Sequence, residues 1–185
     1  MTEWIVLIAA VAVVLYAVVI FNRLVSSRQM ANEAWSGIDV QLKRRSDLVP
    51  NLVEIVKGYA AHERGLLAEV TELRNQARAL AADDVKGRAQ AEGALSLAVG
   101  KLIALAEAYP DLKASTNFLE LQQELSRIEN EIQMARRYYN GAVRNLNTLV
   151  ESVPSNIVAR FTGFTLRSFF ELADPNERAV PRVAV

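Results

Sequence analysis

The sequence predicts an all-α fold, in which an N-terminal transmembrane helix leads into an elongated up-and-down bundle of the four-helix type with long heptad-patterned helices. Residues 5–21 form an uncharged apolar run, and two later segments place apolar residues at alternating spacings of three and four. The composition also favours helices, since 185 residues include only 8 glycines and 5 prolines. We predict three regions: an N-terminus with the membrane anchor at 1–25, a helical bundle at 26–162 and an irregular tail at 163–185.

The charge balance and the lack of cysteine exclude several classes of function. Lys plus Arg and Asp plus Glu number 21 each, so no net charge attracts the chain to nucleic acid, and no basic stripe alternates with aromatic residues. Without cysteine the chain has no disulfide, thiolate zinc site or cysteine nucleophile. The lack of thiols leaves the cellular compartment open.

The run IVLIAAVAVVLYAVVIF, from Ile5 to Phe21, has the length and composition of a membrane span. Twelve of its seventeen residues are Ile, Leu, Val or Phe, which gives an insertion free energy of about −4 to −7 kcal/mol. A helix from Trp4 to Phe21 is ~27 Å long, close to the ~30 Å of the hydrocarbon core. Trp4 takes an interfacial position, and Arg23 can extend to the headgroups. The residues assigned to the anchor are Trp4, Ile5, Leu15, Phe21 and Arg23.

A cleaved signal peptide is the competing interpretation of this run. Signal peptides have a positive n-region and a small-x-small cleavage site, whereas Glu3 is the only charged side chain before the run and FNRLVSS follows it. We therefore predict a retained, single-pass anchor. Because Arg23 and Arg28 follow the span, the positive-inside rule predicts an external N-terminus and a cytoplasmic bundle.

An apolar pattern without a polar interruption lies between Thr116 and Pro154. Its steps alternate between three and four without a polar residue, which is typical of coiled coils and helical bundles. Ser115 or Thr116 can cap this helix, and Pro154 ends it. The pattern comprises Phe118, Leu121, Leu125, Ile128, Ile132, Ala135, Tyr139, Ala142, Leu146, Leu149 and Val153.

A second pattern runs from residue 38 to residue 80 and passes through Pro50 without a change of phase. Val49 is a poor helix cap, so we predict one kinked, continuous helix rather than a helix that starts at the proline. Apolar positions also continue the pattern back toward the span, so the anchor and this helix are expected to be one element. These positions are Leu24, Ala31 and Trp35.

Polar residues interrupt the second pattern at Arg45 and Glu63. Such residues are expected to be partly exposed or paired with a neighbouring helix, and a functional interpretation is that they set helix register. The triplet Lys43, Arg44 and Arg45 is a candidate for contact with lipid or a partner protein. It begins ~30 Å along a helix from the span, so a solvated face is the simpler interpretation.

Two shorter helices are predicted at residues 85–108 and 155–162. The first is about half as long as the pattern at 38–80, so parts of the long helices would expose apolar stripes unless another chain or the returning tail covers them. We therefore predict self-association or docking of the tail, although an aromatic tail more often only covers a core. The residues considered for these contacts are Phe118, Leu125, Ile132, Tyr139, Leu146, Phe161, Phe164, Phe169 and Phe170.

His62, the single histidine, stands beside Glu63 and is the one candidate for hydrolytic or metal chemistry. A zincin pair needs a second histidine where Leu66 stands, and a Glu-x-x-His pair needs a glutamate where Tyr59 stands. The phosphate-loop and serine-nucleophile motifs are also absent. We therefore predict a surface histidine, and assign no catalytic, cofactor-binding or metal-binding residue.

Three long motifs resemble the LemA family of bacterial membrane proteins. They are AWSGIDVQLKRRSDLVPNLVEIVKGYAAHE at 34–63, YPDLKASTNFLELQQEL at 109–125 and IENEIQMARRYYNGAVRNLN at 128–147. The resemblance implies a single-pass anchor in the inner membrane, with the N-terminus outside and a cytoplasmic helical bundle. It provides no catalytic residues to transfer to this sequence.

Two functions of different classes follow from these features. The favoured one is a non-enzymatic, membrane-anchored scaffold that self-associates and organises the membrane or recruits partner proteins. The alternative is an accessory subunit that regulates a membrane enzyme such as a protease, and a hydrolase using His62 and Glu63 is a weak third. The expected partners are membrane lipids, further copies of the chain and a membrane protein, with no cofactor and no nucleic acid.

Overall fold

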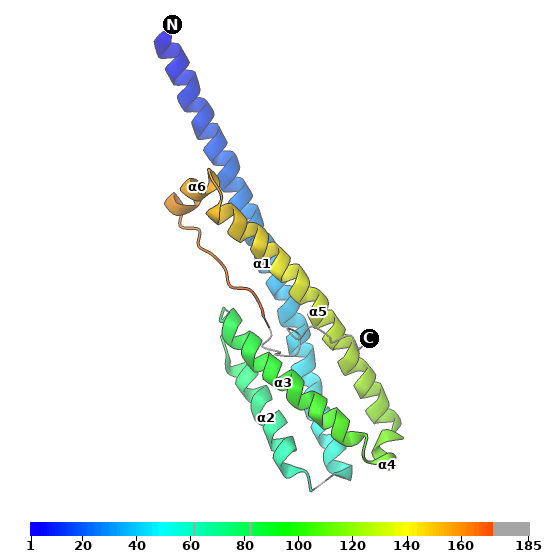
Figure 1. Cartoon of the computed structure of the whole chain (residues 1–185). Helices are drawn as coiled ribbons and strands as arrows, with labels where there is room; N and C mark the ends of the chain where they lie inside the picture. Colours follow the sequence, from blue (N-terminus) through cyan, green and yellow to red (C-terminus); the bar gives the residue numbers. More distant parts are fainter. Residues whose placement is uncertain (61, 82, 172–185) are drawn as a thin grey trace, which may run out of the picture. The chain divides into compact units, whose positions relative to one another are not determined.

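A computed structural model describes residues 1–60, 62–81 and 83–171. All regular secondary structure in these residues is helical, which confirms the predicted all-α class (Figure 1). The helices are α1 (Thr2–Tyr59), α2 (Arg64–Ala79), α3 (Val85–Ala106), α4 (Pro110–Lys113), α5 (Thr116–Glu151) and α6 (Ser155–Phe161).

The chain divides into two compact units, and α1 and α5 each contribute to both. The anchor unit contains residues 1–38 and 135–169. The bundle unit contains residues 39–134 and the chain from Phe170 onward, of which residues 170 and 171 are described. Each unit has its own apolar core.

Helix α1 is continuous from the apolar run through Pro50, which confirms that the helix does not start at the proline and that the anchor and this helix are one element. The prediction that this helix continues to residue 80 is wrong, because α1 ends at Tyr59 and α2 begins at Arg64. Gly58 and Gly65 flank the break, and each weakens a helix by ~1 kcal/mol relative to alanine. Helix α2 instead packs against α3 and buries Leu67 and Val70.

The core of the bundle unit contains residues of five helices, from α1 to α5. Fully buried side chains include Leu52 of α1, Val70 of α2 and Leu102 of α3, and Phe118 of α5 joins them at 1% exposed. Asp84 caps α3, because its carboxylate accepts a hydrogen bond from the Gly87 N–H at 2.9 Å. The 3–4 pattern predicted these buried faces.

The core of the anchor unit joins α1, α5, α6 and the segment that follows α6. It contains Ile20, Leu24, Leu146, Ala159 and Phe164. The Trp35 ring of α1 packs on the Tyr139 ring of α5, with their centroids 5.4 Å apart. The apolar pattern of α5 is thus used inside the chain up to Leu146, whereas Val153 lies beyond the helix and is 79% exposed.

The first residues of the tail are held on α5 by hydrogen bonds. Asn147 accepts a hydrogen bond from the Arg167 N–H and donates one to the Arg167 carbonyl, both at 2.9 Å. The Tyr139 hydroxyl donates to the Ser168 carbonyl at 3.0 Å. Within the anchor unit the returning chain therefore covers part of the α5 apolar stripe.

Tyr139 offers a pH-dependent test of this contact. Burial raises the pKa of the Tyr139 hydroxyl, and the positive charge of Arg167 opposes the shift. The folded state therefore holds this proton more tightly, so the stabilisation is complete below about pH 10 and is lost as the pH rises through the folded pKa. We expect the unfolding free energy to fall above about pH 10 and Tyr139→Phe to reduce that slope.

The matched control is Tyr138→Phe, because Tyr138 is the adjacent residue and is 56% exposed. Denaturant unfolding at a series of alkaline pH values measures the slope for each protein. Equal slopes for Tyr139→Phe and the unmodified chain would show that Tyr139 does not carry the effect.

Candidate functional site, a buried arginine cluster

An arginine occupies a core position of α1 in the bundle unit. Arg45 lies between Leu42 and Val49 on the buried face of the helix, and only 3% of it is exposed. A buried guanidinium without partners is strongly unfavourable, because it loses its hydration and gains nothing in return. The position therefore requires anions from neighbouring helices.

Helices α3 and α5 provide the partners of Arg45. Its Nη2 donates to a carboxylate oxygen of Glu92 at 2.5 Å and to the Glu92 carbonyl at 3.0 Å. Its Nη1 donates to a carboxylate oxygen of Glu129 at 2.8 Å and to the Ser96 hydroxyl. Ser96 in turn donates to the same Glu129 oxygen at 3.3 Å. We call Arg45, Glu92, Ser96 and Glu129 the arginine cluster; it joins α1, α3 and α5.

The two carboxylates of the cluster differ in burial. The Glu92 side chain is 3% exposed, whereas that of Glu129 is 38% exposed. Loss of the guanidinium would therefore leave Glu92 as a buried charge without a counter-ion, while Glu129 could be hydrated. The cluster fits a role in fixing helix register, because only one rotation of each helix brings these groups together.

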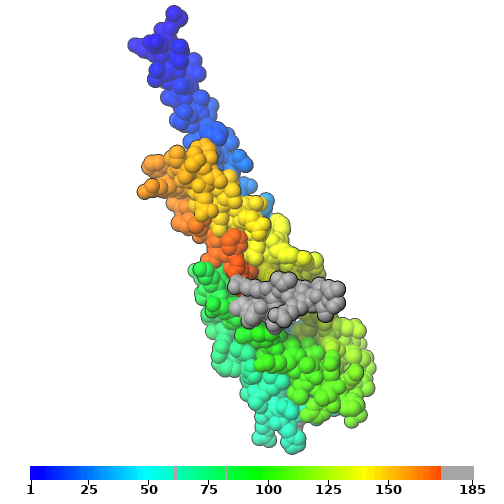
Figure 2. All heavy atoms as spheres, in the orientation of Figure 1, coloured from blue at the N-terminus to red at the C-terminus, as the bar shows by residue number. Residues whose placement is uncertain are grey.

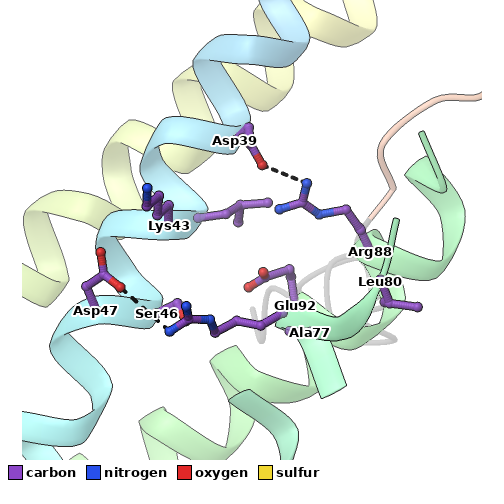
Figure 3. Close-up of a pocket in the computed structure, with 10 residues that line it drawn as sticks. Asp39, Lys43, Ser46, Asp47, Ala77, Leu80, Arg88 and Glu92 are labelled. Atoms are coloured by element: carbon purple, nitrogen blue, oxygen red, sulfur yellow. Dashed lines mark ion pairs between the residues drawn. The ribbon is translucent and has the colours of Figure 1, made fainter. Parts of the chain in front are cut away.

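A polar cavity of about 240 Å³ opens beside the cluster between α1, α2 and α3 (Figure 3). Arg88 and Asp39 form an ion pair across it at 2.6 Å, and Arg78 and Asp47 form a longer one at 3.9 Å. The ionisable lining residues balance in charge: Lys43, Arg78 and Arg88 against Asp39, Asp47 and Glu92. The cavity thus has no excess charge to select an ionic ligand.

Pro50 leaves the Ser46 carbonyl of α1 without its helical hydrogen bond, and Arg74 of α2 donates one to it. Proline has no N–H, so the Ser46 carbonyl loses its usual partner four residues along the helix. The Arg74 Nε–H of α2 donates to this carbonyl at 2.7 Å. The proline therefore stabilises a helix contact while it interrupts the hydrogen-bond ladder.

We expect the effects of Pro50→Ala and Arg74→Leu on stability to be coupled. Arg74→Leu alone should lower the unfolding free energy by about 1–3 kcal/mol, because the Ser46 carbonyl loses its donor. In the Pro50→Ala background an N–H can reach that carbonyl, so the same change should be less destabilising by at least ~0.5 kcal/mol. Denaturant unfolding of the four proteins in the cycle measures the coupling.

Arg78→Leu is the control for this cycle. Arg78 lies one turn along α2, is half-exposed and pairs with Asp47 at the longer distance of 3.9 Å. Its effect should be the same with or without Pro50. Additive effects of Pro50→Ala and Arg74→Leu would contradict the assigned contact.

The basic triplet is divided by the fold. Arg45 is buried in the arginine cluster, whereas Lys43 and Arg44 are exposed on α1. The charge of the exposed Arg44 acts on Glu124 of α5. The pKa of the Glu124 carboxyl is lowered mainly by the hydrogen bonds that Arg127 donates to it, and the positive charge of Arg44 lowers it further. Two of the three cations are thus accessible to lipid or a partner.

The aromatic and aliphatic residues considered for self-association or tail docking include both buried and exposed side chains. The α5 residues Phe118, Leu125, Ile132, Tyr139 and Leu146 are buried in this chain. Phe164 and Phe170 of the tail are buried, Phe169 is half-buried and Phe161 is 86% exposed. Most of these side chains are therefore used inside one chain.

His62 lies exposed in the connection between α1 and α2, beside the half-buried Glu63. In the described part of the chain, no group of three or more His, Cys, Asp or Glu side chains is arranged to hold a metal ion. His62 itself lies in a turn shortly before α2.

The N-terminal part of α1 has the exposure expected of a membrane span. Two described helices, α1 and α3, are long and apolar enough to cross a membrane. In the most apolar 18-residue window, 6% is buried in α1 and 39% in α3. Helix α3 holds the buried Glu92 and is a core helix of the bundle unit. Trp4, Ile5 and Leu15 are exposed, whereas Phe21 contacts Phe164 and Arg23 is exposed beyond the run.

These features define an all-α protein whose apolar N-terminal helix fits a membrane anchor. The chain belongs to the LemA family, whose model matches residues 34–184. This match confirms the resemblance of the sequence motifs.

Named relatives are similar to the chain at modest identity. The magnetosome protein MamQ 2 of Paramagnetospirillum magneticum is 24% identical over 82% of this chain and 64% of its own length. MamQ of Magnetospirillum gryphiswaldense is 23% identical over 81% and 64%. The protein LemA of Metamycoplasma hominis is 27% identical over 75% and 63%. The chain thus matches a little less than two thirds of each of these relatives.

Proposed function

We propose that the protein is a non-enzymatic, membrane-anchored scaffold that self-associates and organises the membrane or recruits partner proteins. The observation that carries the proposal is the continuity of α1, in which an exposed apolar segment extends without a break into a packed bundle. A continuous helix thus connects the apolar segment to the bundle unit without an intervening flexible linker.

The polar chemistry of the bundle unit supports a non-enzymatic role. The buried charges of Arg45 and Glu92 are paired with each other, and the ionisable groups of the neighbouring cavity balance. An active site would instead require groups held free to react. None of the relatives reported above has the name of an enzyme.

Apolar side chains that the bundle unit leaves exposed are the positions to examine for self-association and partner binding. The described bundle unit exposes Val40, Leu97, Leu119 and Met134 at 41–53%. Single exposed apolar residues are common in monomers, so these positions are candidates for contact rather than an interface.

Crosslinking in native membranes, followed by mass measurement in mild detergent, tests the scaffold function. We expect oligomers of the chain or complexes with a partner protein. Recovery of monomers alone, with no partner, would contradict the scaffold. If a membrane enzyme is recovered and its activity changes when the chain is deleted, the accessory-subunit function is favoured instead.

The proposed topology has the N-terminus outside the inner membrane and the bundle in the cytoplasm. It rests on Arg23 and Arg28 after the span and Glu3 before it. Because the chain has no cysteine, one cysteine at the exposed Gln90 can be labelled from either side. A membrane-impermeant maleimide should react with Gln90→Cys only after the cells are opened, and with Thr2→Cys in intact cells. The reverse pattern would place the bundle outside.

A further inference from the structure

The anchor unit presents a second apolar surface besides the span. Ile157 and Phe161 lie four residues apart on one face of α6 and are 55% and 86% exposed. Val153, two residues before α6, is 79% exposed. We call Val153, Ile157 and Phe161 the α6 face. The other face of α6 is packed in the core, where Ser155 and Ala159 are buried.

The α6 face lies at the end of the membrane span. Ala159 of α6 and Phe164 share a core with Ile20 and Leu24 of α1. The Phe164 ring meets the ring of Phe21, the last residue of the apolar run, edge to face at 6.1 Å. The space-filling view shows the span projecting beyond α6 (Figure 2). A bilayer around the span would thus have its surface next to α6.

The same region is strongly basic. Residues 20–30 and 151–168 contain four arginines and one acidic residue, the exposed Glu151, whereas the whole chain is neutral. The Arg28 guanidinium stacks over the Phe164 ring at 4.8 Å, which holds one of these charges beside the tail. The four arginines are Arg23, Arg28, Arg160 and Arg167.

We propose that the α6 face inserts into the interfacial layer of the bilayer beside the span, where Arg23, Arg28 and Arg160 bind anionic phospholipid headgroups. The inference rests on the proposed function, because it requires α1 to be inserted. An exposed apolar face with cations around it is the pattern of helices that lie in the membrane interface. The attraction of cations to anionic lipid adds to the apolar contact.

A second copy of the chain is a poorer occupant of this surface. Three side chains do not provide the area of a stable protein interface, which buries roughly 1,200–2,000 Å² in total. A second copy would also bring its own arginines to the contact, and like charges repel. A lipid surface needs no minimum protein area and has the complementary charge.

Depth-dependent fluorescence quenching tests the proposal on the full chain. Single cysteines at Ile8, Ile157 and Glu33 are labelled with an environment-sensitive fluorophore, and the protein is placed in vesicles of phosphatidylcholine with or without phosphatidylglycerol. Ile8 is in the span, whereas Glu33 is an exposed α1 residue ~18 Å along the helix from Phe21. Lipids carrying a spin label near the headgroup or deep in the acyl chain serve as quenchers.

We expect the deep quencher to act at residue 8, the shallow quencher to act at residue 157, and neither to act at residue 33. Quenching at 157 should increase several-fold with phosphatidylglycerol. Arg160→Gln combined with Arg23→Gln should reduce that dependence while quenching at residue 8 stays unchanged.

Three outcomes would overturn the inference. Quenching at residue 8 without quenching at residue 157 would show that the anchor is inserted but that α6 does not contact the bilayer. Protection of the label at 157 that rises with protein concentration, without lipid quenching, identifies a second copy as the occupant. Absence of quenching at all three positions shows that the anchor itself is not inserted, so the proposed function fails as well.

Discussion

Arg45→Met is expected to lower the unfolding free energy of the bundle by about 3–5 kcal/mol. The change removes the guanidinium that pairs with the carboxylate of Glu92, whose side chain is 3% exposed. A buried carboxylate without a counter-ion loses its hydration and receives no compensation. Denaturant unfolding in mild detergent, followed by helical circular dichroism, measures the loss.

Arg44→Met is the matched control for this prediction. Arg44 is the adjacent arginine and is exposed, so its replacement should change the unfolding free energy by no more than about 0.5 kcal/mol. If both variants behave alike, the arginine cluster does not stabilise the bundle as argued.

Two further variants separate charge from packing. Arg45→Lys keeps the charge but loses the planar fork that reaches Glu92 and Glu129 together, so an intermediate loss is expected. Arg45→Met combined with Glu92→Leu removes both buried charges and should recover much of the stability. The combined variant also keeps the test informative if Arg45→Met alone fails to fold.

The sequence pattern did not predict which residues pair with Arg45. The 3–4 spacing placed Arg45 on the apolar face of α1 and required a partner or exposure. Glu92 and Glu129 are 47 and 84 residues away from Arg45 in the sequence. Their contact with Arg45 depends on how α1, α3 and α5 pack, which the spacing of apolar residues does not specify. One signal was available: Glu92 continues the α3 stripe of Leu95, Val99 and Leu102 backwards by three residues.

The break between α1 and α2 shows a different limit. A periodic pattern identifies the buried face of a helix, but it can continue in phase across a turn when the next helix packs on the same core. Val56 and Val70 are both fully buried in one core, although the chain reverses between them. The paired glycines at 58 and 65 were the local evidence for a break.

The way in which the tail docks on α5 could not be predicted from the apolar periodicity, because the described residues of the tail are not helical. Aromatic composition suggested docking, and Phe164 is indeed buried in the core of the anchor unit. The register of that docking is set by Asn147, whose side-chain amide bonds both backbone groups of Arg167. A half-buried asparagine on the flank of an apolar stripe carries no sequence signal that distinguishes it from a solvated one.

Val11→Arg combined with Val14→Arg is expected to release the protein from the membrane. Each arginine near the centre of a span adds about 2.5–3.5 kcal/mol, and each lost valine removes a further ~0.3–0.6 kcal/mol. The total of roughly 6–8 kcal/mol matches or exceeds the insertion free energy of about −4 to −7 kcal/mol of the run. Both valines are exposed, so the exchange disturbs no packing within the chain.

Val11→Leu combined with Val14→Leu is the control for release, because it alters the same positions and keeps the run apolar. Alkaline extraction followed by flotation with liposomes separates inserted protein, which floats, from soluble or aggregated protein, which does not. Helical circular dichroism of the released arginine variant should retain the signal of the bundle, because the bundle unit has its own core. If the arginine variant still floats as the leucine variant does, the run at residues 5–21 is not what holds the chain to the membrane, and the scaffold function loses the observation on which it rests.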